Sequence, residues 1–292
     1  MRPTLTVGTY NIESFTWRPG TGHHFGPALH HIARCTPTPP DVFALSEARY
    51  AGFDGQRPMW EFTNALSDML PTGETYRPFW APSPGRANPP LLLLNTAKVD
   101  VLRWWAPGEG GVRKWGFAET RPAGTSETTW ISAIHWQGGL GRAEFEREAA
   151  RLASHSQHST LIAGDFNATS SWNGEVSLDW PRMTRERGEK HKLLQKARWS
   201  RLAGRWVLDT EQIDLLREVF DFWDFGERAG DPTVTTGEHG SGLRIDRIMA
   251  SAPFPFTELL SYQVFREDEL RTRRTISDHD YVHAEVQLGD QP

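Results

Sequence analysis

Carboxylate, amide and imidazole side chains recur in this sequence where short apolar runs begin or end. They are spread over almost the whole chain and comprise Asn11, Glu13, Glu47, His135, Asp165, Asn167, Asp246, Asp278 and His279. Carboxylate and amide oxygens are the ligands that hard divalent cations prefer. Clustered carboxylates repel one another unless a cation or a proton lies among them. If the apolar runs are strands that share one edge of a sheet, these side chains predict a metal-loaded site there.

Each of these residues alone also has a simpler structural interpretation. Asp165 and Asn167 could form only a tight turn, and Asp246 could belong to a surface ion pair. His135 could be a core histidine whose hydrogen bonds are satisfied. The functional interpretation depends on all of the groups occurring together and in order along one chain.

The apolar runs are typical of β-strands, because they are short and mostly bounded by Gly, Pro, Asn, Asp or Ser. We expect strands at Leu5–Tyr10, Val42–Leu45, Leu91–Leu94, Val99–Trp105, Trp130–His135, Leu161–Ala163, Ile245–Ala250 and Tyr281–Val286. Apolar residues at helical spacing predict helices around Phe25–Ile32, Trp60–Leu70 and Phe145–Leu152. The Pro-rich stretch Pro78–Pro90 is interpreted as a surface loop. Because strands and helices intermix along the whole length, the sequence predicts one α/β domain over residues 1–292.

Composition narrows the class of protein. With 38% hydrophobic and 24% charged residues, the chain can form a sizeable packed core. A formal net charge of -5 excludes a uniformly basic protein that coats nucleic acid. The single cysteine, Cys35, excludes an intramolecular disulfide and a cysteine-based zinc site. No apolar run is long enough to span a bilayer, and the N-terminus lacks a signal-peptide pattern, so we expect a cytoplasmic monomer without membrane insertion.

Taken in order, the polar motifs resemble those of the endonuclease/exonuclease/phosphatase superfamily. That superfamily includes deoxyribonuclease-I-like nucleases, apurinic/apyrimidinic endonucleases, neutral sphingomyelinases and inositol polyphosphate 5-phosphatases. The motifs are Thr9–Glu13, Leu45–Glu47, Ile134–Trp136, Gly164–Asn167, Arg244–Ile248 and Ser277–His279. The resemblance implies a four-layer α/β sandwich, in which two mixed β-sheets pack face to face with helices outside. It also implies a phosphoesterase that depends on Mg²⁺ or Mn²⁺.

The resemblance further implies which residues hold the metal. Glu47 corresponds to the metal carboxylate, and Asn11 helps to position both metal and phosphate. Glu13 stands where many members carry a second acidic group, although the nuclease-type pattern more commonly has Asp there. Asp278 is a further metal contact that the resemblance suggests.

The same resemblance implies the chemical roles. Asp165 positions or activates the attacking water and is our first choice of general base, with His279 second. Asn167 donates to the phosphoryl oxygens, and Asp246 orients and polarises His279. His135 resembles the second histidine of deoxyribonuclease-I-like members. Those members often pair that histidine with a glutamate just before the strand that is Leu91–Leu94 here, where this sequence has no acid.

A basic segment, which we call the basic insert and place around residues 172–212, lies between the Gly164–Asn167 and Arg244–Ile248 motifs. From Arg182 to Arg205 it carries nine Lys or Arg and two Glu, a net charge of +7, so the remainder of the chain carries -12. Basic side chains interleaved with aromatics suit a polyanion whose bases can stack. The substrate-binding candidates are Lys190, Lys192, Lys196, Arg198 and Trp199.

These observations favour a metal-dependent nuclease that hydrolyses phosphodiester bonds by in-line attack of water. Two other functions stay open. One is a phosphatase or phosphodiesterase for a small phosphorylated metabolite or lipid head group, and the other is a catalytically silent binding module. The basic insert could also be only a solvated amphipathic helix, with an apolar stripe at Leu193, Leu194, Ala197 and Leu202.

Overall fold

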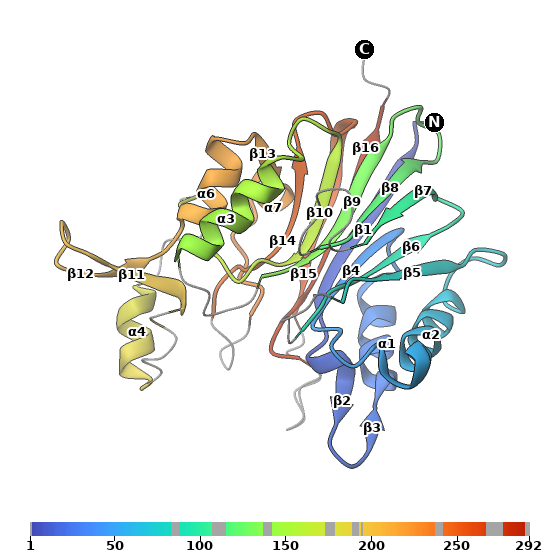
Figure 1. The fold of residues 1–292 in the computed structure, drawn as a ribbon, viewed down its shortest axis with the longest axis horizontal. Coiled ribbons are helices and arrows are strands. Elements are labelled where there is room, and N and C mark those ends of the chain that lie inside the picture. The colour runs from blue at the N-terminus through green and yellow to red at the C-terminus, as the bar shows by residue number, and fades with distance from the viewer. Residues whose placement is uncertain are drawn as a thin grey trace.

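Two mixed β-sheets of six strands each form the centre of the molecule in the computed structural model (Figure 1). The structure describes residues 2–82, 88–106, 115–136, 142–172, 179–188, 193, 195–236, 242–266 and 277–289. In the first sheet the order is β15-β16-β1-β4-β6-β5. Its strands are β1 (Thr4–Asn11), β4 (Val42–Ser46), β5 (Tyr76–Trp80), β6 (Leu91–Asn95), β15 (Phe256–Phe265) and β16 (Tyr281–Leu288).

The second sheet has the order β13-β14-β10-β9-β8-β7. Its strands are β7 (Val99–Trp105), β8 (Phe117–Pro122), β9 (Thr129–His135), β10 (Thr160–Asp165), β13 (Phe222–Asp224) and β14 (Asp246–Ser251). Its inner strands face those of the first sheet, with β1 packed against β10 and β14, and β4 against β9. The predicted sandwich of two mixed sheets is therefore confirmed.

Helices cover both outer faces of this sandwich, as Figure 1 shows. On the side of the first sheet lie α1 (Phe25–Cys35) and α2 (Phe53–Ser67). On the side of the second sheet lie α3 (Arg142–Ala153) and α6 (Glu211–Glu218), with the short α7 (Phe225–Ala229) beyond β13. The helices expected around residues 25–32, 60–70 and 145–152 correspond to α1, α2 and α3, although the side chain of Phe145 lies outside the described residues.

Strand β4 shows why its sequence is continuously apolar. Val42 and Ala44 belong to the core between the sheets, whereas Phe43 and Leu45 belong to the core beneath α1 and α2. Successive residues of a strand point to opposite faces, so a strand buried on both faces needs apolar residues at every position. Truncating the fully buried Phe43 to alanine would cost about 3–5 kcal/mol of stability.

The parallel pairs of strands determine where polar side chains collect. Strand β1 runs parallel to β4, and β10 runs parallel to β9, so all four end at one edge of the sandwich. Strands β14 and β16 are antiparallel to β10 and β1, so they begin at that same edge. We call it the catalytic edge. In register there, Asp165 pairs with His135 on one side and with Asp246 on the other.

Strand β5 corrects the expectation of a loop at Pro78–Pro90. Residues up to Trp80 belong to the strand, and Pro78 pairs in register with Leu93 of β6. Proline cannot donate a hydrogen bond to a neighbouring strand, but β5 is the last strand of its sheet and needs partners on one side only. Residues 83–87, in the middle of the expected loop, lie outside the described residues.

Among its described residues, the basic insert contains a helix, further helical residues at 193, 195 and 196, and a hairpin, so one continuous amphipathic helix does not describe it. Helix α4 (Trp180–Glu186) is followed by the hairpin of β11 (Ala197–Ser200) and β12 (Arg205–Leu208). Ala197 and Leu193 pack with Trp180 in a small core that also includes Leu243 and Ile245. Leu202 is fully exposed in the turn of the hairpin, and Leu194 lies outside the described residues.

Candidate active site

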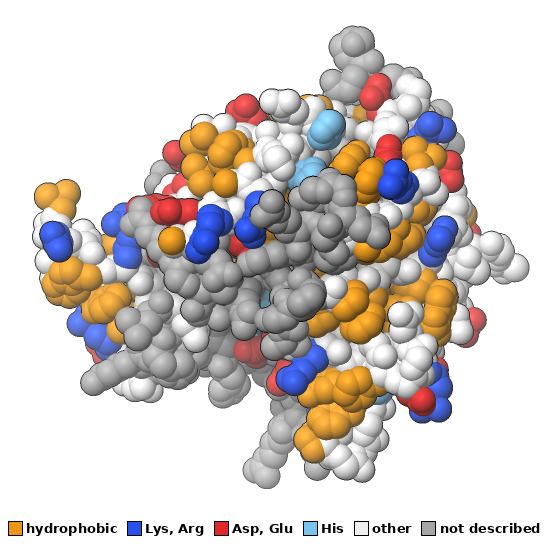
Figure 2. All heavy atoms as spheres, viewed as in Figure 1, with side chains coloured by type: hydrophobic (Ala, Val, Ile, Leu, Met, Phe, Trp, Pro, Cys, Tyr) orange, Lys and Arg blue, Asp and Glu red, His pale blue; other side chains and the backbone are white. Residues whose placement is uncertain are grey.

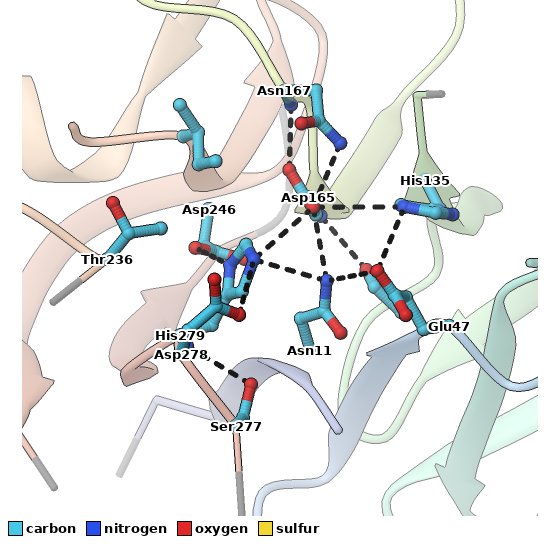
Figure 3. Close-up of polar contacts among 12 residues, drawn as sticks. Asn11, Glu47, His135, Asp165, Asn167, Thr236, Asp246, Ser277, Asp278 and His279 are labelled. Atoms are coloured by element: carbon cyan, nitrogen blue, oxygen red, sulfur yellow. Dashed lines mark hydrogen bonds and ion pairs between the residues drawn. The ribbon is translucent and has the colours of Figure 1, made fainter. Parts of the chain in front are cut away.

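Asp246 and His279 form a buried pair at the catalytic edge (Figure 3). His279 Nδ1 lies 2.8 Å from Asp246 Oδ2, which also accepts a hydrogen bond from Thr235 Oγ1 at 2.7 Å. Burial alone would lower the pKa of His279, but the carboxylates of Asp246 and Asp165 raise it to about 10. Burial raises the pKa of Asp246, and His279 opposes that rise. The pair thus holds a proton on an imidazole whose other nitrogen, Nε2, lies 3.8 Å from Asp165.

A tight turn after β10 places Asp165 and Asn167. At Gly164 the backbone φ is +146°, and a Cβ there would lie 1.9 Å from the carbonyl oxygen of Ile134, so only glycine fits. Asp165 Oδ1 accepts the backbone N–H of Asn167 at 2.7 Å, and Oδ2 accepts its side-chain amide at 3.0 Å. The predicted turn chemistry is therefore present, and it serves to aim both side chains at the catalytic edge.

Asn11 links the two sheets at this edge. Its Nδ2 lies 3.3 Å from Glu47 Oε1, 3.2 Å from Asp165 Oδ2 and 3.4 Å from His279 Nε2. The other oxygen of Glu47 accepts the backbone N–H of Ser14 at 3.3 Å. One amide thus contacts a predicted metal carboxylate, the predicted base and the predicted histidine, although the four residues come from distant parts of the sequence.

His135 faces Glu47 and Asp165 from the end of β9. Its Nε2 lies 4.0 Å from Glu47 Oε1 and 3.8 Å from Asp165 Oδ2. Its Nδ1 lies 2.6 Å from the backbone carbonyl oxygen of Asn88. That carbonyl accepts a hydrogen bond in the region where a glutamate partner is missing from the sequence, so Nδ1 carries the hydrogen and Nε2 faces the site.

Glu13 and Asp278 lie at the solvent-facing side of the site. Asp278 is about half exposed, and its Oδ1 is 3.6 Å from His279 Nε2. Burial and the neighbouring carboxylates of Asp278 and Glu47 raise the pKa of Glu13. Both residues therefore accompany the buried groups as an outer pair of carboxylates.

Several residues of the site have left-handed backbone conformations that are uncommon for residues other than glycine. These are Glu47 with φ 61°, Asn167 with φ 52° and the four consecutive residues from Glu13 to Thr16, with φ between 39° and 55°. Such conformations cost free energy and persist only where the surrounding structure imposes them, which is common at functional sites.

Three functional contacts have no recognisable signal in the sequence. Ser46 accepts the backbone N–H of Asp165 at 3.0 Å and donates to the carbonyl oxygen of Ile134 at 3.2 Å, which joins β4 to the second sheet directly behind the site. Thr235 positions Asp246, as described above. A serine after an apolar run or a threonine in a loop is too common to mark either role.

The arginines beside Asp246 form a buried network instead of an ion pair with it. Arg244 and Arg247 both donate to Asp224 at the start of α7, with 2.8 Å between Arg247 Nη1 and Asp224 Oδ2. Burial alone would raise the pKa of Asp224, but the two guanidinium groups lower it to about 2. The network joins β14 to β13, and Asp246 pairs with His279 instead of with these arginines.

The residues expected to bind substrate divide into three groups. Lys190 and Lys192 lie outside the described residues. Arg198 and Trp199 are solvent-exposed on the hairpin, and Arg198 Nε is 3.7 Å from Glu211. Lys196 instead points inward. It is only 8% exposed, and its Nζ donates to the backbone oxygen of Asn167 at 2.8 Å and to the side-chain oxygen at 2.5 Å.

The chemistry of the donor set fits a divalent cation. Asp165, Asp246 and His279 each offer a ligand atom within 4.8 Å of the others, and all three side chains are buried. Asp246 Oδ1 is also buried and has no hydrogen-bond partner among the described residues. Carboxylates packed this closely need a cation or shared protons to offset their repulsion.

Comparisons with known proteins agree with this geometry. The chain resembles an endonuclease/exonuclease/phosphatase from Bacteroides vulgatus (12% identity, TM-score 0.61), covering 99% of this chain and all of the other. It resembles an AP endonuclease from Archaeoglobus fulgidus (14%, 0.59), covering 96% and 98%. It also resembles TDP2 from C. elegans (14%, 0.55), covering 98% and 75%. These likenesses concern the fold.

No curated protein matches the sequence. None of the helices in the described residues is long and apolar enough to cross a membrane. The profile of one protein family matches residues 8–279, a range that contains the whole catalytic edge from Asn11 to His279. The members of this family are phosphoesterases that depend on divalent metals. The chain belongs to the Endonuclease/Exonuclease/phosphatase family.

Proposed function

We propose that the protein is a Mg²⁺- or Mn²⁺-dependent nuclease that hydrolyses a phosphodiester bond of nucleic acid. The observation that carries the proposal is that direct contacts link Asn11, Glu47, Asp165, Asp246 and His279 into one cluster at a single edge. A metal carboxylate, a candidate base and a proton-bearing histidine lie there around one point, where a phosphate can be held.

The metal would be held on the Glu47 side of the site. Glu47 and Asn11 offer oxygen ligands there, and Glu13 and Asp278 supply further carboxylates near the solvent. His279 faces the site only through Nε2, because its Nδ1 is engaged by Asp246. A bound divalent cation supplies charge neutralisation at the phosphoryl oxygens and stabilises the leaving oxygen.

The protein side chains would share the remaining work. Asp165 accepts a proton from the attacking water, which approaches phosphorus in line with the leaving oxygen. His279 donates a hydrogen bond from Nε2 to a phosphoryl oxygen, and Asp246 holds the ring for that purpose. The side chain of Asn167 does not face the phosphate position in this structure. Its amide donates to the backbone oxygen of Trp136 and to Asp165, and its oxygens accept from Lys196. It contributes to phosphate binding if that amide turns toward the substrate.

Two observations support nucleic acid as the substrate. The hairpin of the basic insert projects from the body and carries cationic and apolar side chains, which gather at the left of Figure 2. They include Arg198, Trp199, Arg201, Leu202 and Arg205, all exposed. Cationic groups neutralise phosphates, and an exposed indole can stack on a base. One protein with a similar fold is an AP endonuclease.

A small phosphorylated molecule is the second candidate, and one observation favours it. Lys196 turns into the site instead of toward the solvent, so the net charge of the basic insert overstates the charge available to a long polyanion. A buried ammonium beside Asn167 suits a single phosphate group better than an extended backbone.

An activity screen tests the proposal. The protein is assayed on single-stranded, double-stranded and abasic DNA, on RNA and on a panel of small phosphate esters, with Mg²⁺, Mn²⁺ or EDTA. We expect cleavage of nucleic acid that EDTA abolishes and that Glu47→Gln weakens through poorer metal binding. Full activity in EDTA would exclude the metal-dependent mechanism, and cleavage confined to small esters would favour the second candidate.

A further inference from the structure

A pocket opens beside the catalytic edge, on the side away from the basic insert (Figure 1). It has a volume of about 450 Å³ and is lined by Glu13, Thr16, Trp17, Arg18, Thr21 and His24 among others. It lies between the turn at Ser14–Thr16, the small hairpin of β2 (Trp17–Arg18) and β3 (Gly22–His23), and the start of α1. None of the roles assigned above uses this pocket, apart from Glu13 as an outer carboxylate.

The pocket is joined directly to the catalytic machinery. The backbone N–H of Glu13 donates to Asn11 Oδ1 at 3.1 Å, and that of Ser14 donates to Glu47 Oε2 at 3.3 Å. The wall residues follow at once in the chain, from Thr16 onward. A group held in the pocket would therefore lie next to a phosphate at the catalytic edge, and would belong to the same substrate.

One wall of the pocket is a planar aromatic surface. The indole of Trp17 is half-buried, and its ring centroid lies 4.5 Å from that of Tyr50, which packs in turn on Phe53 at 4.8 Å. Tyr50, in the loop before α2, therefore supports the Trp17 ring, and Phe53 at the start of α2 supports Tyr50. A supported ring that borders a cavity is the usual arrangement for stacking on a second planar ring.

The remaining wall is polar and carries both signs of charge. Glu13 offers an acceptor, Arg18 offers donors, and the Nε2 of His24 is 2.8 Å from Thr21 Oγ1. Such groups suit a ligand with a flat ring and a rim of donors and acceptors. An aliphatic chain would leave them without hydrogen bonds, which is costly, and a bare phosphate would meet the Glu13 carboxylate.

We propose that this pocket, which we call the Trp17 pocket, binds the nucleobase of a nucleotide that flanks the scissile phosphate. The inference rests on the proposed function, since it names the part of the substrate that lies beside the hydrolysed bond. The left-handed backbone from Glu13 to Thr16 agrees with it, because that costly conformation shapes both the pocket wall and the contact with Glu47.

The experiment removes the base from the substrate and the ring from the protein, separately and together. Oligonucleotides with one cleavable phosphodiester carry either a normal nucleotide or a base-free sugar on each side of that bond. We expect Trp17→Ala to lower kcat/KM on the normal strand about 5- to 100-fold, mainly through KM, because stacking contributes about 1–3 kcal/mol per base. On the strand that lacks the flanking base, the same variant should act like the wild type. Trp17→Phe should recover most of the loss.

Two further variants guard against a loss of folding. Trp60→Ala removes a different indole, which is exposed on α2 outside the lining of the pocket. This variant should leave kcat/KM unchanged on both strands. Thr21→Trp keeps the support under Trp17 and fills the pocket, so it should reproduce the base-dependent loss. An equal loss by Trp17→Ala on both strands, or no base-dependent loss in either pocket variant, overturns the proposal.

If the protein is not a nuclease, a binding experiment still tests the pocket. If the wild type cleaves no oligonucleotide, calorimetric titration with a nucleoside monophosphate and with the matching base-free sugar phosphate, both in Ca²⁺, tests the pocket by itself. Tighter binding of the nucleotide that Trp17→Ala abolishes supports the pocket without a nuclease. Equal binding of the two ligands by the wild type overturns it.

Discussion

Asp165, Asp246 and His279 at the catalytic edge are each at most 8% exposed, whereas Trp199 in the basic insert is 53% exposed and Leu202 is fully exposed. The edge is held by hydrogen bonds between strands of both sheets, so a change at one residue alters its neighbours. The outer part of the hairpin contacts few other elements, and its side chains can change nearly independently. From this difference we expect changes at the edge to affect mainly kcat and changes in the outer hairpin to affect mainly substrate binding.

Lys196 belongs to the basic insert by sequence and to the catalytic edge by contact. It lies just before β11, where its carbonyl accepts the backbone N–H of Asp209 at 2.9 Å, and its ammonium reaches Asn167. The base of the insert thus contacts the candidate active site, whereas its outer hairpin is exposed and can serve as a binding surface.

The largest effect should follow from breaking the Asp246–His279 pair. We expect Asp246→Asn and His279→Ala each to lower kcat by roughly 10³-fold or more. The first variant loses the carboxylate that orients the His279 ring, and the second loses the donor to the phosphate. Residues that act as a unit are not additive, so the double variant should be little worse than either single one. Steady-state kinetics measures this, and multiplied losses in the double variant would show that the two side chains act separately.

Lys196→Met should have the next largest effect. It keeps most of the length of the side chain and removes the ammonium that donates to Asn167. A buried hydrogen bond to a charged group contributes about 1.5–3 kcal/mol, so we expect kcat to fall about 10- to 100-fold. Arg198→Met, two residues along the same segment, should leave kcat on a small phosphodiester almost unchanged. A loss confined to KM in Lys196→Met would assign this lysine to the binding surface instead.

The pH dependence of stability should also distinguish the two regions. In the metal-free protein the carboxylates of Asp246 and Asp165 raise the folded-state pKa of His279 to about 10, above its usual value of 6.5. The folded state therefore keeps a proton that the unfolded state has lost. The stability gained from the pair is fully present below pH 6.5 and is lost as pH rises through 10. Urea unfolding should show the advantage of wild type over His279→Gln shrinking by on the order of 1 kcal/mol or more across that window. For Arg198→Gln the difference should stay constant.

The smallest effects should come from the outer hairpin. Replacing Arg198, Arg201 and Arg205 with alanine should weaken oligonucleotide binding and reduce the slope of log K against log salt by roughly 0.7 to 0.9 for each lost phosphate contact. Trp199→Ala should affect single strands more than duplexes, because only unpaired bases can stack on the indole. An unchanged affinity and salt slope in the triple variant would leave the hairpin without a role in substrate binding.

The sequence by itself determined the main strands and the polar groups at their ends. Runs such as Val42–Leu45 can be predicted as strands from the sequence, because a strand that is buried on both faces has consecutive apolar residues. The ordered motifs from Asn11 to His279 then predicted the family and the sandwich. The edge strands β15 and β5 were not predicted, because β15 is partly exposed along its length and Pro78 is tolerated in β5 only through its position at the end of a sheet.

The tertiary structure alone decided which distant groups meet. Nothing near Lys196 in the sequence distinguishes it from Lys190 or Lys192, and its place beside Asn167 follows from the folding of the insert against the sandwich. The contacts of Ser46 with Asp165, and of His135 with the carbonyl oxygen of Asn88, likewise join segments that are far apart along the chain. Propensity and periodicity report local preferences, whereas these contacts depend on how the two sheets and the insert pack together.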